Sequence, residues 1–208
     1  DEKGAAQLTE RAALLLSVIF LPISILTVLL SEDIVTIVYA RGAFDAESVR
    51  VCAQALRGYA LMFVPMIFQE VYSRFLYGYR DARRPMINSS VSVVCNIALS
   101  VALCPRLGVL GVAVATSVAS ALCGVLNLLS ARRQHPELHC GVLLHTLPWL
   151  AVGSAACGVT AWLCTARLAG SSPLVRFILT ALLGIAAYAL AAAPLLLRLW
   201  RQLRRKPE

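Results

Sequence analysis

Three charged side chains interrupt an otherwise apolar stretch of this sequence and are the first candidates for chemistry. Glu70 and Arg74 are four residues apart with the acid first, so on a helix they would share one face and could form an ion pair. Arg57 lies in the same stretch, nearer its other end. Charges are costly within a membrane and commonly mark a substrate pathway there. Two interpretations follow: the residues line a cavity that receives an anionic headgroup, or they pair and extend toward the lipid headgroups.

Neutral oxygen and amide groups form a second candidate set on two later apolar stretches. A polar residue recurs every four positions from Asn88 to Ser100, which predicts a polar stripe along one helix. Thr116, Ser120 and Asn127 place a similar stripe on the next stretch. Such stripes join neighbouring helices by hydrogen bonds in some membrane proteins. They could also surround a hard cation, which prefers oxygen ligands.

The histidines, cysteines and other reactive residues are not grouped as a catalytic or metal site requires. His135 and His139 are four apart beside Cys140, but Pro136 between them breaks helical spacing, so we expect a solvated loop rather than a metal site. None of the seven cysteines forms a CxxC pair, and most lie in apolar runs as small buried residues. The chain has no GxxxxGK[ST] motif and no catalytic cluster of serine, cysteine or carboxylate. We therefore expect no enzyme, no metal and no cofactor.

The elements that must position these residues are membrane spans. Of the 208 residues, 59% are hydrophobic and only 14% are charged, and the mean hydropathy is +0.76. Soluble domains carry nearly twice that share of charge. Six windows approach or exceed the roughly 20 apolar residues that cross a bilayer. They are Ala12–Leu30, Val51–Tyr79, Met86–Cys104, Leu107–Ala131, Val142–Ala166 and Phe177–Leu197. The fold class is therefore an all-α integral membrane protein, with bends allowed at Pro22, Pro65 and Pro194.

The distribution of basic residues orients these spans. Twelve lysines and arginines fall in the two termini and in the second and fourth loops, against five in the opposite loops. Because basic residues concentrate on the cytoplasmic side, both termini are expected in the cytoplasm. The same rule accounts for the net charge of +8 without a nucleic acid partner.

Four linked stretches in this order give the chain a family resemblance. "YARGAFDAESV", "ALRGYAL", "SRFLYGYRDARRPM" and "NIALSVALCPRLGVLGVAVATSVAS" resemble the MurJ/MviN family of lipid II flippases, within the multidrug/oligosaccharidyl-lipid/polysaccharide (MOP) exporter superfamily. The resemblance is strongest over residues 8–130. It implies the last six helices of a fourteen-helix transporter built from two lobes. Residues 1–135 would correspond to family helices nine to twelve, and residues 136–208 to two further helices that form a lipid-tail groove, followed by a basic cytoplasmic tail.

The resemblance also implies a function and its partners. The family moves an undecaprenyl-pyrophosphate-linked peptidoglycan precursor from the cytoplasmic to the outer leaflet of the bacterial cytoplasmic membrane by alternating access. Besides this substrate, the implied partners are membrane lipids and an N-terminal lobe upstream, which would carry the principal substrate-binding arginines. Two alternatives stay open. One is another MOP exporter of lipid-linked oligosaccharides or drugs, and the other is a membrane scaffold that does not transport.

Two groups of residues take roles from the resemblance. Arg41, Gly42, Phe44 and Asp45 match the family's outer loop, where Gly42 suits a tight turn and Asp45 or Ser48 suits a helix cap. Some family members bind sodium in this lobe. The matching positions are Asn96, Ser100, Val112 through its carbonyl, and Thr116. Ser100 stands where those members carry an aspartate, so we expect weak or absent sodium dependence.

Overall fold

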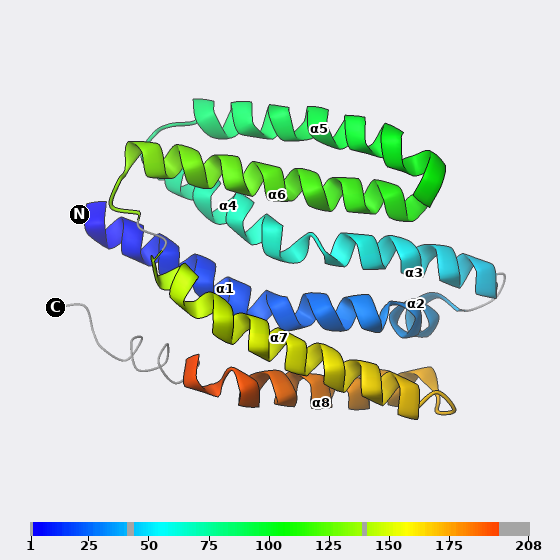
Figure 1. Ribbon diagram of the computed structural model, residues 1–208. Coiled ribbons are helices and arrows are strands. Elements are labelled where there is room, and N and C mark those ends of the chain that lie inside the picture. Colours follow the sequence, from blue (N-terminus) through cyan, green and yellow to red (C-terminus); the bar gives the residue numbers. More distant parts are fainter. Residues whose placement is uncertain (1, 41–43, 139–140, 196–208) are drawn as a thin grey trace.

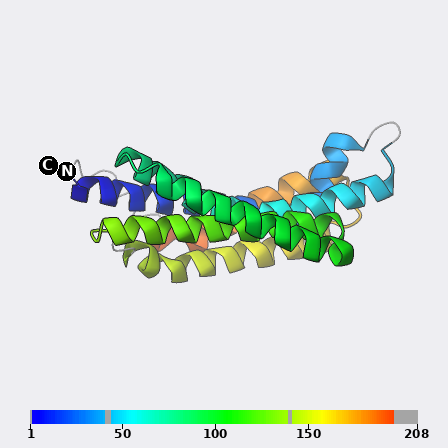
Figure 2. The same ribbon diagram turned by 90° about the horizontal axis from the view of Figure 1, so that it is seen from above.

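The computed structural model describes residues 2–40, 44–138 and 141–195. Within these residues, helices are the only regular secondary structure (Figure 1). The helices are α1 (Glu2–Leu29), α2 (Ser31–Tyr39), α3 (Ala46–Ala60), α4 (Phe63–Gly78), α5 (Arg83–Leu107), α6 (Val109–Gln134), α7 (Gly141–Arg167) and α8 (Pro173–Ala191). The long helices lie side by side in a bundle that is thinner when viewed from above (Figure 2). The all-α prediction is confirmed.

The expected membrane spans are present, although one of them is divided. Within the described residues, five helices are long and apolar enough to cross a membrane, or six if α3 and α4 form one span bent by 42°. The span expected over Val51–Tyr79 is therefore a pair of helices joined at a bend. That segment begins earlier, at Ala46, and is broken between Ala60 and Phe63.

Pro65 explains the break between α3 and α4. A proline has no N–H to offer the carbonyl four residues back, here that of Leu61, and its ring crowds that position. The Ser24 hydroxyl of α1 donates to the neighbouring Ala60 carbonyl at 2.6 Å, so a side chain satisfies one acceptor at the break. Pro22, by contrast, lies within an unbroken α1. A proline in a span thus permits a break here without requiring one.

The short helix α2 was not expected, because the first span was taken to end at Leu30 with no helix after it. Figure 1 looks nearly along α2 while α1 lies across the view, so the chain turns sharply at Leu30. Glu32 and Asp33 occupy the first turn of α2. Negative charge is favourable at a helix N-terminus, so this "SED" sequence stabilises a new helix rather than a loop.

Gly108 alone connects α5 to α6, which confirms the tight hairpin expected from "CPRLGVLG". Its φ of 59° lies in the left-handed region that glycine tolerates best. One turn later, a Cβ on Gly111 would come within 2.7 Å of the Leu103 carbonyl oxygen. The absence of a side chain at Gly111 therefore allows the two helix backbones to approach closely.

Two clusters of buried apolar side chains hold the described bundle together, and α1 contributes to both. The first lies between α1, α7 and α8, with Leu14, Leu26, Leu30, Cys157 and Tyr188 among its members. The second lies toward the N-terminal end of α1. It contains Ala6, Tyr72, Phe75, Leu76, Ala131 and Leu138. Because both clusters use α1, this helix connects the α7–α8 pair to α4 and α6.

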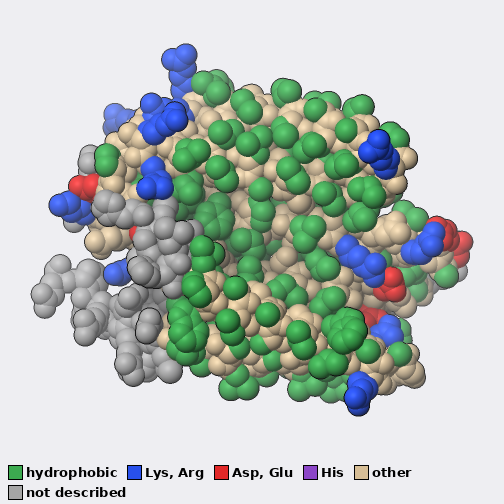
Figure 3. All heavy atoms as spheres, in the orientation of Figure 1, with side chains coloured by type: hydrophobic (Ala, Val, Ile, Leu, Met, Phe, Trp, Pro, Cys, Tyr) green, Lys and Arg blue, Asp and Glu red, His purple; other side chains and the backbone are tan. Residues whose placement is uncertain are grey.

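The outer surface is that of a multi-pass membrane protein. Figure 3 shows apolar side chains across the middle of the molecule and charged side chains gathered at its two ends. On α5, only 6% of the most apolar window is buried inside the molecule, and Val94 and Val101 are about 70% exposed. A surface this apolar is stable in lipid, where exposed hydrocarbon carries no penalty.

Candidate functional site

A groove between α1 and α4 brings together two of the charged candidates. It has a volume of about 700 Å³ and opens near the N-terminal end of α1. Glu70 and Arg74 are its charged lining residues. The other lining residues are Ala5, Leu8, Thr9, Ala12, Leu16, Val71, Phe75, Gly78 and Tyr79. The groove is therefore mainly apolar, with one acidic and one basic side chain on its wall.

Glu70 and Arg74 also contact each other. Arg74 Nε lies 3.5 Å from Glu70 Oε2, across one turn of α4. The Arg74 side chain is 79% exposed and that of Glu70 is 48% exposed, so the pair is loose and accessible. The sequence suggested either a cavity lining or an ion pair for these residues. In the structure, Glu70 and Arg74 form an ion pair and also line the groove.

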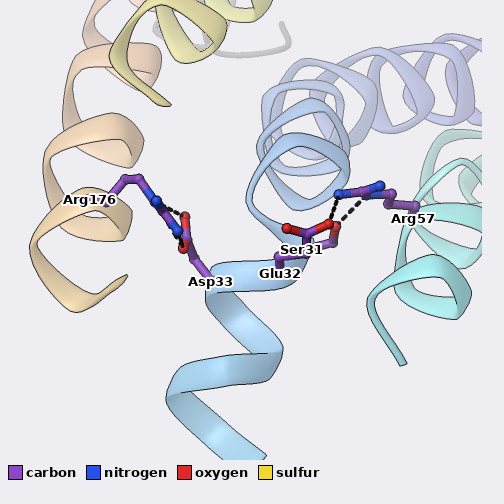
Figure 4. Close-up of polar contacts among 5 residues, drawn as sticks. All are labelled: Ser31, Glu32, Asp33, Arg57 and Arg176. Atoms are coloured by element: carbon purple, nitrogen blue, oxygen red, sulfur yellow. Dashed lines mark hydrogen bonds and ion pairs between the residues drawn. The ribbon is translucent and has the colours of Figure 1, made fainter. Parts of the chain in front are cut away.

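Arg57 lies at the opposite end of the molecule and takes part in a different contact. Its Nε donates to Ser31 Oγ at 2.7 Å and its Nη2 to Glu32 Oε1 at 2.7 Å. These bonds join α3 to the beginning of α2 (Figure 4). Arg57 is not among the lining residues of the α1–α4 groove.

A second ion pair at this end was missed by the sequence reasoning. The Asp33 carboxylate accepts hydrogen bonds from Arg176 Nε at 2.8 and 3.0 Å, and Nη2 of the same arginine also contacts it. Figure 4 shows Glu32 and Asp33 pointing in opposite directions from α2, one toward α3 and the other toward α8. The partners are 143 residues apart in the sequence, so no local spacing pattern could predict their contact. The one available signal was an aspartate directly after an apolar span.

The outer loop predicted from the resemblance is described in part. Arg41 and Gly42 lie outside the described residues. Phe44 packs against Tyr39, with ring centroids 5.9 Å apart. Asp45 caps α3 by accepting the Ser48 backbone N–H at 2.8 Å, and this bond lowers the pKa of its carboxyl. Phe44 and Asp45 border a pocket of about 530 Å³, whose lining also includes Glu32, Thr36, Ala40, Ala46, Val49, Arg50 and Arg176.

Half of the polar stripe on α5 joins neighbouring helices. Asn88 Nδ2 donates to Asn127 Oδ1 of α6 at 2.8 Å, and Asn127 Nδ2 donates to Ser73 Oγ of α4 at 2.8 Å. Further along, the Ser92 hydroxyl donates to the Ala119 carbonyl at 2.6 Å. These buried groups act as hydrogen-bonded contacts between spans.

The other half contains the candidate cation ligands, and its hydrogen bonds are internal to each helix. Ser100 Oγ donates to Asn96 Oδ1 at 3.1 Å on α5, and Thr116 Oγ1 donates to the Val112 carbonyl at 3.0 Å on α6. The Asn96 and Ser100 side chains are half-buried. Among the described residues, no group of three or more histidine, cysteine, aspartate or glutamate side chains is arranged to hold a metal ion.

The segment after α6 is packed rather than fully solvated. The His135 ring lies on that of Tyr79, with centroids 3.9 Å apart, and Leu138 is buried beside α4. His135 is half-buried against aromatic residues at the end of α4 while Gln134 and Pro136 are exposed, so the expectation of a solvated loop holds only in part. His139 and Cys140 lie outside the described residues.

The chain is similar in sequence and in fold to known proteins. The family model "Lipid II flippase MurJ" matches residues 1–177. A Rhizobium tropici protein named "Probable lipid II flippase MurJ" is 31% identical over 134 residues, covering 64% of this chain and 25% of that protein. A namesake from Helicobacter pylori (strain 26695) is 28% identical over 151 residues, covering 73% and 32%. The solved structure "Lipid II flippase MurJ, inward closed conformation" aligns with a TM-score of 0.71 at 20% identity, over 90% of this chain and 37% of that one. The chain thus spans about a quarter to a third of the length of these curated relatives.

Proposed function

This chain belongs to the MurJ family of lipid II flippases, and we propose that it works in moving a lipid-linked peptidoglycan precursor across the membrane. The observation that carries the proposal is the family match over residues 1–177. The shared fold supports it, with a TM-score of 0.71 to the MurJ structure. The reaction is translocation, and no bond in the substrate is made or broken.

The α1–α4 groove is our candidate for the part of this chain that meets the substrate. Its apolar wall suits a lipid chain, and the guanidinium of Arg74, 79% exposed, is available to an anionic headgroup. A phosphate could replace the loose contact with Glu70, because charge-assisted bonds from arginine to phosphate are strong and geometrically matched. Glu70 would then hold Arg74 in place between transport events.

The proposal also includes the orientation of the chain in the membrane and the energy source for transport. Both termini face the cytoplasm, as the distribution of basic residues supports. The α1 N-terminal end of the groove then lies at the cytoplasmic leaflet, where the precursor would enter, and the Asp33–Arg176 pair lies at the outer side. Alternating access would be driven by membrane potential rather than by sodium, since Asn96, Ser100, Val112 and Thr116 provide no carboxylate.

The test is lipid II translocation in cells depleted of their own flippase and supplied with the complete protein that contains this chain. The wild type should restore appearance of the precursor in the outer leaflet. Arg74→Ala should reduce the rate, and Arg74→Lys should retain part of it. Arg106→Ala serves as the matched control, because Arg106 is an exposed arginine in the last turn of α5, away from the groove.

Two results would contradict the proposal in different ways. If Arg74→Ala and Arg106→Ala both translocate at the wild-type rate, the groove has no role in headgroup binding. If the wild-type protein is present in the membrane at normal levels but restores no translocation, the flippase function itself is wrong. A scaffold that does not transport would then be the better description.

A further inference from the structure

We propose that the Asp33–Arg176 ion pair fixes the position of α8 against the corner between α1 and α2, so that α7 and α8 move with α1 as one rigid body. This proposal concerns which helices move together and does not depend on what the protein transports.

The ion pair is buried on the side of Asp33 and partly buried on the side of Arg176. The Asp33 side chain is 5% exposed and that of Arg176 is 24% exposed, and the guanidinium contacts both carboxylate oxygens. Two parallel bonds fix the relative orientation of the groups as well as their distance. Separating the pair is costly chiefly for Asp33, because its buried carboxylate would be left without this partner.

The helices below the pair are in close apolar contact. A Cβ on Gly184 of α8 would lie 2.8 Å from Leu26 Cδ2 of α1. Leu26 and Leu30 belong to the same buried cluster as Cys157 of α7 and Tyr188 of α8. Such contacts hold the helices together by van der Waals packing. The ion pair supplies a single defined position, a role for which buried polar pairs are well attested.

The neighbouring pair on α2 provides an internal comparison. Glu32 and Arg57 are 57% and 40% exposed, and such accessible pairs contribute little to stability. The end of α3 that carries Arg57 is also held by other bonds: Ser117 Oγ donates to the Gly58 carbonyl at 2.7 Å, and Ser24 bonds the Ala60 carbonyl. Adjacent acids on one helix turn therefore differ in role. Asp33 positions α8, whereas α3 keeps its place without Glu32.

Distances between spin labels in lipid nanodiscs test the proposal. Labels are placed on exposed residues of the two helices, Ile19→Cys on α1 and Leu174→Cys on α8, with the native cysteines of the complete protein replaced. We expect one narrow distance distribution. Asp33→Asn should lose this single peak, and the charge exchange Asp33→Arg with Arg176→Asp should restore it. Glu32→Gln, the matched control, should leave the peak unchanged.

Several outcomes would overturn the proposal, and none requires a transport assay. A broad or double distribution with the ion pair intact would show that α8 already moves against α1. An unchanged narrow peak in Asp33→Asn would show that apolar packing alone sets the position. Equal broadening by Glu32→Gln and Asp33→Asn would remove the distinction between the two acids. If Asp33→Asn fails to fold, the intact-pair measurement and Arg176→Lys, which keeps the charge but loses the double contact, still decide the matter.

Discussion

Asn88 on α5 donates its side-chain amide to the side-chain oxygen of Asn127 on α6 at 2.8 Å, and both residues are buried. Asn127 in turn donates to Ser73 on α4. One amide side chain therefore connects three spans, and removing it would leave Asn88 with only its 3.1 Å bond to Ser130 Oγ. Substitution of Asn127 therefore tests how much these hydrogen bonds contribute to the stability of the bundle.

Asn127→Ala should destabilise the bundle by about 1–3 kcal/mol, because it removes the hydrogen bonds that connect Asn127 to α5 and to α4. The measurement is unfolding in mixed detergent micelles, followed by helix content. Asn96→Ala is the control, since Asn96 is half-buried and its hydrogen bond to Ser100 stays within α5. Equal losses for the two variants would show that the connection between helices adds nothing.

Glu70 and Arg74 should behave as a coupled pair. Reversing both charges should be milder than reversing either one, with a coupling energy of about 1 kcal/mol or less because both side chains are accessible. A double-mutant cycle on unfolding free energies measures this coupling. Strict additivity of the single effects would show that the 3.5 Å contact has no energetic role.

Transport should depend weakly or not at all on sodium. The four candidate ligands offer neutral oxygens without a carboxylate, whereas one charge crossing about 100 mV gains about 2.3 kcal/mol. The assay is flipping by the complete protein in liposomes, with sodium exchanged for potassium at fixed potential. If activity collapses on this exchange, returns with sodium and is abolished by Asn96→Ala, a sodium site exists after all.

The turn between α4 and α5 should loosen in acid. The Arg84 backbone N–H, followed by the Gln134 side chain, lowers the pKa of the Asp81 carboxyl from its usual value of 3.8. A lowered folded-state pKa means that the ionised form stabilises the turn above pH 3.8, and that this contribution is lost as the pH falls through the lowered value. Hydrogen exchange at the Arg84 amide, corrected for its intrinsic rate, should increase over that range. Asp81→Asn should remove the pH dependence.

The loop between α2 and α3 should face outside the cell. A cysteine introduced at Ala43, in a variant without native cysteines, should react with an impermeant reagent added to intact cells. Ala43 lies outside the described residues, so this prediction rests on the distribution of basic residues. Labelling only after permeabilisation would reverse the proposed orientation.

The sequence predicted what depends on local pattern. Hydropathy located the spans, because about 20 apolar residues have few other uses. The Glu70–Arg74 contact followed from a four-residue spacing, and the cap at Asp45 from residue type. The Asp33–Arg176 pair could not be predicted in this way, since it depends on the packing of α8 against α1. The turn at Leu30 was missed for a related reason: "SEDIVTIVY" continues an apolar run, and only the acids in its first turn indicate a new helix.

The single-residue connection at Gly108 has a consequence for how the protein is made. Because the turn is this short, we expect α5 and α6 to enter the bilayer together as one antiparallel hairpin. Pairing at that stage would shield the Asn88 and Ser92 side chains from hydrocarbon by giving them Asn127 and Ala119 as partners. The polar stripe of α5, which would hinder insertion of the helix alone, is thereby compatible with biogenesis.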